Sequence, residues 1–240
     1  MPDNLQSQQL SLSSSDYDLR ITNLARFIYK RLPIKKGTFI DIGAGNGLFL
    51  KCFLNKGFNA EGIELEKDQV HQMKEDYKLK DVSIRQGDIS KLKGNQSYDV
   101  VVASDVIEHI ENDKQALENL YSFVKPWGYL VITVPAHQFL FGKRDIGWGH
   151  HRRYNKIDLI DKLTVVKGAK VININYWNTL GFFAYFFFEK ILKTPIREEF
   201  RYKKSFFSSA IRFFLDKILR FEEVFGSPIG LTLVAIIQKT

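Results

Sequence analysis

The stretch that decides the fold is Asp41-Ile42-Gly43-Ala44-Gly45-Asn46-Gly47, which follows an apolar run at residues 38–42 and precedes a helical pattern at residues 48–55. Glycines at alternate positions let the backbone turn sharply, and they let a ligand approach the free N–H groups of a helix N-terminus. A dinucleotide fingerprint would place its third glycine at position 48, where this chain has Leu48. The turn therefore predicts a strand–turn–helix ligand site of another kind.

Strand-like and helical segments alternate on both sides of this turn. Helices are expected at residues 16–33, 48–55, 67–77, 113–124 and 156–167. Strands are expected at residues 38–42, 60–65, 82–85, 100–103, 129–134, 170–176 and 231–238. This alternation is typical of βαβ units, so we predict an α/β, doubly wound (Rossmann-like) fold around a mainly parallel sheet.

Acidic residues stand at the ends of the next two predicted strands. Glu64 ends the second strand, and Asp88 follows the third in Gln86-Gly87-Asp88-Ile89. An acid in the position of Glu64 can accept hydrogen bonds from both hydroxyls of a ribose. The fourth strand leads into Ser104-Asp105-Val106-Ile107, and the turn Lys125-Pro126-Trp127-Gly128 precedes the fifth. These positions predict one ligand site along a single edge of the sheet.

Together these residues resemble the class I S-adenosylmethionine-dependent methyltransferases. The D-x-G-x-G-x-G turn is similar to their first motif, and Lys125-Pro126-Trp127-Gly128 is similar to their K-P-G-G turn, with Trp127 as a departure. The resemblance covers about residues 38–167 well and the rest loosely. It implies a seven-stranded sheet with an antiparallel last strand, S-adenosyl-L-methionine as cofactor, and an Asp41 that orders the turn. The implied cofactor contacts are Asp41, Gly43, Ala44, Gly45, Gly47, Glu64, Leu65, Asp88, Ile89 and Ser104.

Two classes within this superfamily are disfavoured by the residues after the fourth strand. Amino-methyltransferases of the DNA-adenine kind carry [DNS]-P-P-[FYW] there, whereas this chain has Ser104-Asp105-Val106-Ile107. Pyrimidine C5 methyltransferases need a cysteine nucleophile, but Cys52 lies in the helix after the glycine turn, away from this loop.

Asp105, Glu108 and His109 have the spacing i, i+3, i+4, which places side chains on one face of a helix. Oxygen ligands with an imidazole suit Mg²⁺, Mn²⁺ or Zn²⁺. The run resembles a metal site in quinone-biosynthesis O-methyltransferases and small-RNA 3′-terminal ribose methyltransferases, with Asp105 where those groups have Glu. The further histidine that the RNA group uses corresponds best to His150. Without a metal, Glu108, His109 and His150 are candidates for a general base or for fixing the loop.

The loop that carries His150 reads Gly149-His150-His151-Arg152-Arg153-Tyr154. Arg152 and Arg153 could clamp an anionic substrate through paired donors. The alternative is an ordinary junction between a loop and a helix.

The C-terminal part of the chain is aromatic and basic. Residues 182–225 hold 12 of the 20 Phe residues, and residues 189–220 carry nine basic against four acidic side chains. Two helices are expected, at residues 178–192 and 206–225, within an insertion spanning residues 178–226. This pattern favours a lid over an apolar substrate or a helix at a membrane interface. The alternatives are two helices that bury their Phe residues against each other and a basic surface that is merely solvated.

We expect a single domain over residues 1–240 with a flexible polar tail at residues 1–15. The tail lacks the basic start and apolar core of a signal peptide, and the single Cys52 excludes a disulfide framework and a Cys-rich zinc site. A cytoplasmic location follows, with membrane association as an extension of it.

The functional hypothesis is methyl transfer to a hydroxyl of an apolar or lipid-linked small molecule, with a divalent metal as an optional second cofactor. An RNA 3′-terminal ribose methyltransferase is the main alternative, favoured by the net charge of +8 and the metal-like motif. The third hypothesis is a non-catalytic scaffold that binds S-adenosylmethionine. The acceptor atom and the oligomeric state are left open.

Overall fold

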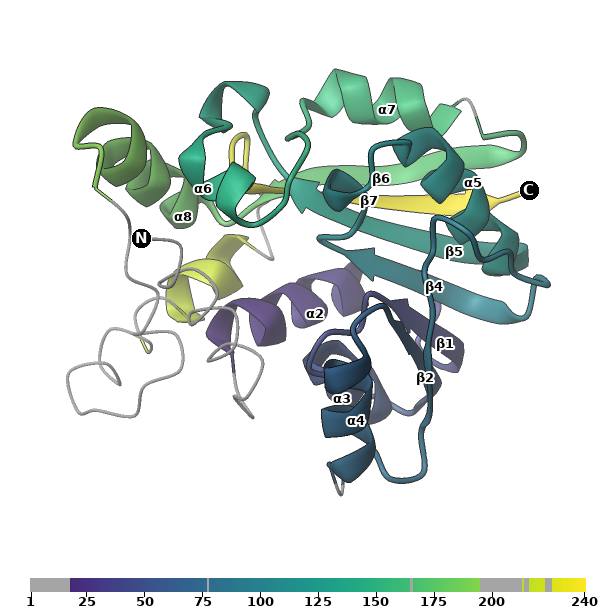
Figure 1. The fold of residues 1–240 in the computed structure, drawn as a ribbon. Coiled ribbons are helices and arrows are strands. Elements are labelled where there is room, and N and C mark those ends of the chain that lie inside the picture. The colour runs from purple at the N-terminus through teal and green to yellow at the C-terminus, as the bar shows by residue number, and fades with distance from the viewer. Residues whose placement is uncertain (1–17, 77, 165, 195–212, 214–215, 223–225) are drawn as a thin grey trace.

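The computed structural model describes residues 18–76, 78–164, 166–194, 213, 216–222 and 226–240. Their centre is a seven-stranded sheet in the order β3-β2-β1-β4-β5-β7-β6 (Figure 1). The strands are β1 (Gly37–Ile42), β2 (Phe58–Glu64), β3 (Ser83–Gln86), β4 (Tyr98–Ser104), β5 (Val124–Pro135), β6 (Ala169–Trp177) and β7 (Thr232–Lys239).

The pairing directions confirm the predicted fold class. The pairs β1–β2, β1–β4, β2–β3 and β4–β5 are parallel, and β7 runs antiparallel to both β5 and β6. The carboxyl ends of β1 to β5 therefore meet at one edge of the sheet. Chain order reverses between β1 and β4, which is where open α/β sheets bind ligands.

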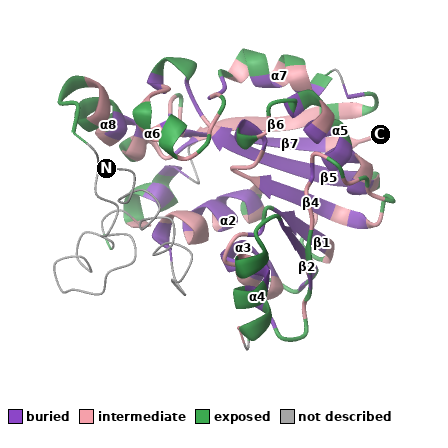
Figure 2. Ribbon diagram, in the orientation of Figure 1, coloured by how far each residue is buried: buried purple, intermediate pink, exposed green. Residues whose placement is uncertain are grey.

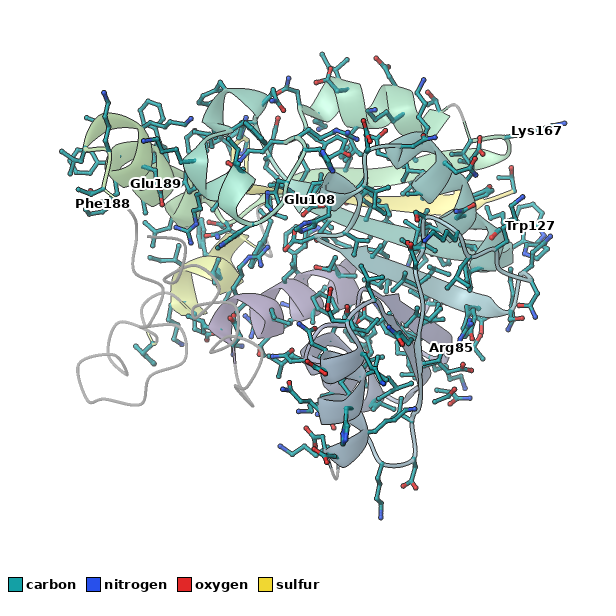
Figure 3. The ribbon with its side chains drawn as sticks, viewed as in Figure 1. Arg85, Glu108, Trp127, Lys167, Phe188 and Glu189 are labelled. Atoms are coloured by element: carbon teal, nitrogen blue, oxygen red, sulfur yellow. The ribbon has the colours of Figure 1, made fainter. Side chains whose placement is uncertain are left out.

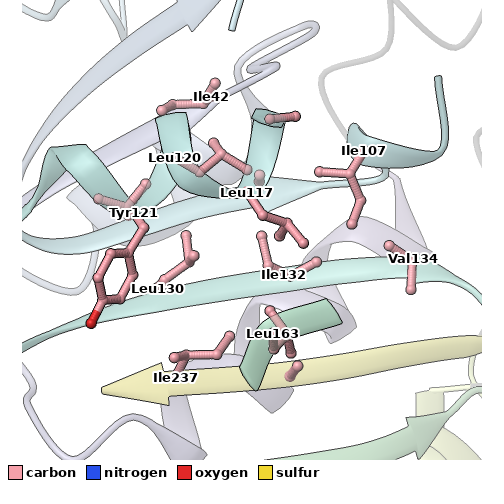
Figure 4. Close-up of a cluster of buried hydrophobic side chains, with 14 of the residues drawn as sticks. Ile42, Ile107, Leu117, Leu120, Tyr121, Leu130, Ile132, Val134, Leu163 and Ile237 are labelled. Carbon is pink, nitrogen blue, oxygen red and sulfur yellow. The ribbon is translucent and has the colours of Figure 1, made fainter. Parts of the chain in front are cut away.

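Helices cover both faces of the sheet because successive strand residues point to opposite sides. On one face lie α2 (Leu19–Arg31), α3 (Leu48–Leu54) and α4 (Lys67–Glu75), whose buried residues cluster with Phe39 and Val100. On the other lie α5 (Asp113–Phe123) and α7 (Lys156–Thr164), whose buried residues cluster with Ile40 and Val101. Figure 2 shows the buried central strands, and Figure 4 shows Leu117, Leu120 and Leu163 packed around Ile132 and Ile237.

The first helix lies at its predicted position, and both its N-cap and its apolar stripe are present. The Asp18 carboxylate accepts hydrogen bonds from the N–H groups of Arg20, at 2.7 Å, and Ile21, at 3.1 Å. Such a cap stabilises a helix by about 1 kcal/mol. Leu24, Phe27 and Ile28 have helical spacing and are fully buried. The buried face orients α2 along the sheet, with Arg20 near the ligand edge.

Some predicted boundaries were wrong. The Lys125-to-Gly128 turn lies within β5, where Trp127 has a φ of 65° and the pairing with β4 shifts between Tyr98 and Val100. An irregularity in the strand therefore takes the place of a separate turn. The loop after β5 contains a 3₁₀ turn, η2 (Gln138–Leu140), and a short helix, α6 (Lys143–Gly147).

The predicted aromatic helix at residues 178–192 consists of two segments. α8 (Thr179–Tyr185) passes into a π-helical segment, η3 (Phe186–Ile191). Residues 216–222 are helical, but the rest of the second predicted helix and the predicted tail at residues 1–15 lie outside the described residues, apart from Phe213. In the part of the chain that the structure describes, no helix combines the length and apolarity needed to cross a bilayer.

Candidate active site

The glycine turn has the strained backbone that its sequence predicts. Gly43, Gly45 and Gly47 have φ angles of 81°, 55° and 74°, a region that favours glycine. A Cβ at Gly43 would lie 2.5 Å from Cγ2 of Val106, in the loop after β4. The N–H groups of Gly43 and Ala44 both donate to the Ile63 carbonyl, at 2.8 and 3.1 Å. The turn is thus held against β2 on one side and packed against the β4 loop on the other.

Glu64 receives three backbone hydrogen bonds. Its carboxylate accepts from the N–H of Gly45 at 2.7 Å, of Leu65 at 2.7 Å and of Glu66 at 3.0 Å. The residue is buried, whereas Leu65 beside it is exposed. The carboxylate is therefore oriented at the end of β2 and linked directly to the glycine turn. A carboxylate has about four lone-pair sites, so it can accept further donors.

Asp41 is a buried acid at the end of β1. It is only 1% exposed, and its Oδ1 has no hydrogen-bond partner among the described residues. Burial, reinforced by the nearby Glu64 charge, raises the pKa of Asp41 to about 8. A buried carboxyl group that lacks a donor favours a cationic or hydrogen-donating ligand, because the charged form otherwise remains uncompensated.

The other predicted cofactor contacts occupy different environments along the same edge. Asp88 accepts from the N–H and hydroxyl of Ser90, at 2.9 and 2.6 Å, and these hydrogen bonds lower its pKa. Ile89 is buried in the core cluster, and its carbonyl accepts a hydrogen bond from the Asn119 amide at 2.7 Å. The Ser104 hydroxyl lies 2.9 Å from that of Thr133 on β5.

The predicted helical face from Asp105 to His109 was wrong. Asp105 has a φ of 56°, and only Ile107–His109 forms a helical turn, η1, of the 3₁₀ type. The Asp105 N–H donates to the Thr133 carbonyl at 3.0 Å, which keeps the residue in line with the sheet. Its carboxylate pairs with the Arg20 guanidinium and accepts from the Thr133 hydroxyl at 3.3 Å. Residues i and i+3 share a face only where the chain is helical, so Asp105 is separated from the predicted ligand group.

Glu108, His109 and His150 do come together. One ligand atom from each lies within 4.8 Å of the others, and the two imidazole rings meet edge to face with centroids 4.6 Å apart. Figure 3 shows Glu108 near the carboxyl edge of the sheet. We name these three residues the Glu-His-His cluster.

The surroundings of Glu108 and His109 favour the uncharged forms of these two side chains. Glu108 is fully buried, and neither of its carboxyl oxygens has a hydrogen-bond partner among the described residues. Burial, and then the Asp105 charge, raises the Glu108 pKa well above its usual range. Loss of hydration, and then the neighbouring His150, lowers the pKa of His109 to about 4. His109 as a residue remains exposed, so solvent screens part of this effect.

Residues that the sequence prediction missed hold the cluster in place. Asp145 on α6 accepts a hydrogen bond from Nδ1 of His150 at 3.0 Å and is 1% exposed. The His151 N–H donates to the Glu108 carbonyl at 2.8 Å, which joins the two loops. Asp145 stands five residues before His150 in a glycine-bounded loop, a weak signal that sequence alone does not distinguish from a helix cap.

The predicted anion clamp has internal partners instead. Arg152 donates to the carbonyls of Ile110 and Glu111, at 3.0 and 2.8 Å, and its guanidinium pairs with Asp113. Arg153 is buried and donates through Nε to Asp145 at 2.8 Å. These contacts favour the alternative of a loop-to-helix junction.

Comparison with known proteins agrees with this architecture. A family model described as a methyltransferase domain matches residues 17–167. The ubiquinone biosynthesis O-methyltransferase of Rickettsia typhi is 32% identical over 117 residues, which cover 45% of this chain and 46% of that protein. The Rickettsia canadensis protein of the same name is 35% identical over 102 residues, 42% of this chain and 43% of that protein. The chain thus matches less than half of each relative's length.

A solved structure extends the likeness to the whole fold. The S-adenosylmethionine-dependent methyltransferase of Mesorhizobium loti superposes with a TM-score of 0.61 at 12% identity, over 91% of this chain and 98% of that one. Its identity is low enough that it shows the fold alone. The chain belongs to the methyltransferase domain family.

Proposed function

We propose that this protein is an S-adenosylmethionine-dependent methyltransferase, and that it methylates a hydroxyl group on an apolar or lipid-linked small molecule. The observation that carries the proposal is the Glu-His-His cluster, which places proton-accepting or metal-binding side chains at the ligand edge of the sheet. The curated relatives, which are named ubiquinone biosynthesis O-methyltransferases, support an oxygen acceptor.

S-adenosylmethionine carries the methyl group on a positively charged sulfonium. When the methyl group is transferred, the rest of the cofactor leaves as a neutral thioether. The residues along the edge suit this cofactor in composition. The open glycine turn offers close backbone approach, the unpaired Oδ1 of Asp41 suits its positive charge, and Glu64 suits its ribose hydroxyls. We assign Asp88, Leu65, Ile89 and Ser104 to the remaining cofactor contacts on the same reasoning. The buried setting of Asp41 and Glu64 strengthens these interactions by excluding water.

The cluster provides the proton acceptor for the hydroxyl. His150 donates through Nδ1 to Asp145 in the tautomer that leaves Nε2 free, and a carboxylate partner stabilises the imidazolium that forms. As the acceptor oxygen forms its bond to the methyl carbon, its proton passes to His150. His109 beside it is uncharged at neutral pH, so it adds no repulsion to the new imidazolium.

A divalent cation fits the same three residues. Two imidazoles and one carboxylate form a donor set that zinc and non-haem iron sites use with open positions for substrate. Glu108 would contribute an oxygen that has no other partner among the described residues, while Asp145 orients His150 from behind. A cation there would lower the pKa of the acceptor hydroxyl. We therefore include a metal at Glu108, His109 and His150 in the proposal, with Asp105 outside it.

The substrate class rests on an aromatic surface, which we define as Phe139, Phe183, Phe186, Phe187 and Phe188. All five are exposed, and ring contacts connect Phe139 with Phe186, at 6.5 Å, and Phe187 with Phe188, at 5.4 Å. The exposure of these five phenylalanines supports such a surface over the alternative in which they are buried against a second helix. An aromatic surface next to the ligand edge suits an apolar acceptor or the surface of a lipid membrane.

An RNA 3′ terminus is the second candidate substrate. The Glu-His-His cluster favours it, since the sequence motif resembles the metal site of the RNA group. Basic residues of the 189–220 segment would add affinity for phosphates, although residues 195–212 lie outside those the structure describes.

Transfer of a labelled methyl group distinguishes these substrates. The enzyme is incubated with labelled S-adenosylmethionine and, separately, with total lipid, total small RNA and soluble metabolites. Label in the lipid or apolar metabolite fraction supports the proposal. Label in RNA alone would replace it with the second candidate, and label in no fraction would return the scaffold hypothesis.

A further inference from the structure

The carboxylate of Asp145 collects four donors from three different parts of the chain. Oδ1 accepts from Nδ1 of His150 at 3.0 Å and from Nε of Arg153 at 2.8 Å. Oδ2 accepts from the Gly142 N–H at 3.0 Å and from the Tyr185 hydroxyl at 3.3 Å. Four donors match the lone-pair capacity of a carboxylate, so Asp145 is fully satisfied while only 1% exposed.

His150 is tied to this one residue twice. Besides the contact at the ring, its backbone N–H donates to the Asp145 carbonyl at 2.9 Å. The two bonds restrict rotation of the ring about its side-chain torsions. Because an ionised carboxylate only accepts, Nδ1 must carry a proton, and the neutral ring then has a free lone pair on Nε2. The ring therefore offers Nε2 as its acceptor atom.

We propose that Asp145 is a positioning residue that holds His150 as the Nδ1–H tautomer and presents its Nε2 to the acceptor site. That Nε2 binds a proton or a cation rests on the proposed function, whereas the tautomer of the His150 ring does not depend on it. Asp145 itself touches neither of the other cluster side chains in any described contact.

The aromatic helix braces this arrangement. Tyr185 lies on α8, and the Arg153 guanidinium is 4.5 Å from the centroid of the Tyr185 ring. On the next turn, Glu189 pairs with Arg144 of α6 at 2.8 Å. α6 is thus attached to α8 through Asp145 and Tyr185 and to η3 through Arg144 and Glu189, and the position of Asp145 depends on these contacts. Loss of the Tyr185 hydroxyl alone removes one of four donors, so Tyr185→Phe should leave the His150 tautomer in place.

Asp145→Asn changes the hydrogen bonding without removing volume. One acceptor oxygen becomes an NH₂ donor, which then faces other donors. Depending on how the amide is oriented, these are either His150 and Arg153 or Gly142 and Tyr185. If the amide turns its NH₂ to His150, the ring must switch to the Nε2–H tautomer. A carboxylate that hydrogen-bonds a functional histidine in this way typically contributes about 10–100-fold in activity or metal affinity.

Nitrogen-15 NMR of labelled histidine in the full chain tests the proposal directly, with His150→Gln identifying the signals. The wild-type ring should show a protonated Nδ1 and an unprotonated Nε2, and Asp145→Ala, which keeps no acceptor oxygen in either orientation, should abolish this pattern. Methyl transfer should fall about 10–100-fold in kcat, with the affinity for S-adenosylmethionine unchanged.

Asp113→Asn is the matched control, because Asp113 is an equally buried acid. It pairs with Arg152 and Lys162 and accepts from the Tyr154 hydroxyl, away from the cluster. It should lower the Tm yet leave both the His150 tautomer and kcat intact.

A wild-type His150 that carries its proton on Nε2 overturns the proposal, and this measurement needs no variant to fold. So does a His150 signal that is unchanged in Asp145→Ala. An enzyme with the expected tautomer but no transfer to any hydroxyl would instead contradict the proposed function.

Discussion

The carboxylate of Glu64 accepts a hydrogen bond of 2.7 Å from the backbone N–H of Gly45. This bond joins the end of β2 to the middle of the glycine turn after β1, two segments 19 residues apart. The glycine turn and Glu64 are therefore already connected before a ligand binds, so binding costs little conformational entropy in this part of the site.

We expect Glu64→Ala to weaken binding of S-adenosylmethionine by about 1–3 kcal/mol, because it removes a charge-assisted acceptor from a buried position. Calorimetry with S-adenosylmethionine, S-adenosylhomocysteine and NAD measures the effect, and NAD should give no signal with either protein. Glu66→Ala is the control, since Glu66 is exposed two residues away. Equal loss in both variants would argue against a specific role for Glu64.

A metal at the Glu-His-His cluster predicts a clear response to chelators. EDTA should abolish methyl transfer and leave the affinity for S-adenosylmethionine nearly intact, and Glu108→Ala should reproduce the loss. Asp105→Asn should retain the response to EDTA, because the Asp105 carboxylate is engaged by Arg20. His71→Ala, at an exposed histidine on α4, is the control.

The contrary outcome is equally informative. Transfer that ignores EDTA but disappears in His150→Ala would assign the cluster to proton transfer without a metal.

The buried Asp41 should make the ligand-free protein less stable as pH rises. Its folded-state pKa of about 8 is above the ordinary 3.8, so its favourable contribution is complete below about pH 4 and is lost as pH rises to about 8. Asp41→Asn removes this dependence. The stability advantage of the variant should grow by up to roughly 1.4 kcal/mol per pH unit within that window. Urea unfolding of both proteins between pH 4 and 9 measures it.

Asp99→Asn should show the opposite slope. Hydrogen bonds from Thr38 and the charge of Lys125 lower the pKa of Asp99 despite its partial burial. The wild-type advantage over this variant is therefore present at neutral pH and shrinks as pH falls through the Asp99 pKa. Parallel curves for the two variants would contradict the environment described for Asp41.

The aromatic surface predicts association with lipid. The double variant Phe183→Ser, Phe187→Ser should lose sedimentation with vesicles of anionic phospholipid, since each buried Phe contributes about 1.5–3 kcal/mol. Salt should weaken wild-type binding only in part, because apolar burial persists when charges are screened. Trp127→Ser is the matched control. Trp127 is 69% exposed, and Figure 3 shows it at the opposite end of the molecule from Phe188.

If vesicles bind neither protein, and oligonucleotide affinity falls steeply with salt, the basic segment serves RNA.

Local pattern was enough to predict the fold and the cofactor edge. The alternation of strands with helices is a property of neighbouring residues, and the observed sheet order confirms the fold that it predicts. The cofactor contacts assigned to the glycines of residues 41–47, Glu64 and Asp88 stay predictions. Spacing suggested that Asp105, Glu108 and His109 share a face, and the resemblance added His150; the structure brings Glu108, His109 and His150 together, and their chemical roles stay predictions. Spacing reports a face only if the backbone is helical, and Asp105 lies outside the 3₁₀ turn.

The sequence by itself determined that this chain forms a doubly wound sheet with a glycine turn for a cofactor, because backbone preferences and apolar periodicity act over a few residues. Only the tertiary structure decided which side chains meet. Arg20 reaches Asp105 across 85 residues, and Asp145 reaches Tyr185 across 40. Such contacts depend on how α2 and α8 pack on the sheet. That packing is determined by the burial of whole helix faces, and a local sequence pattern does not predict it.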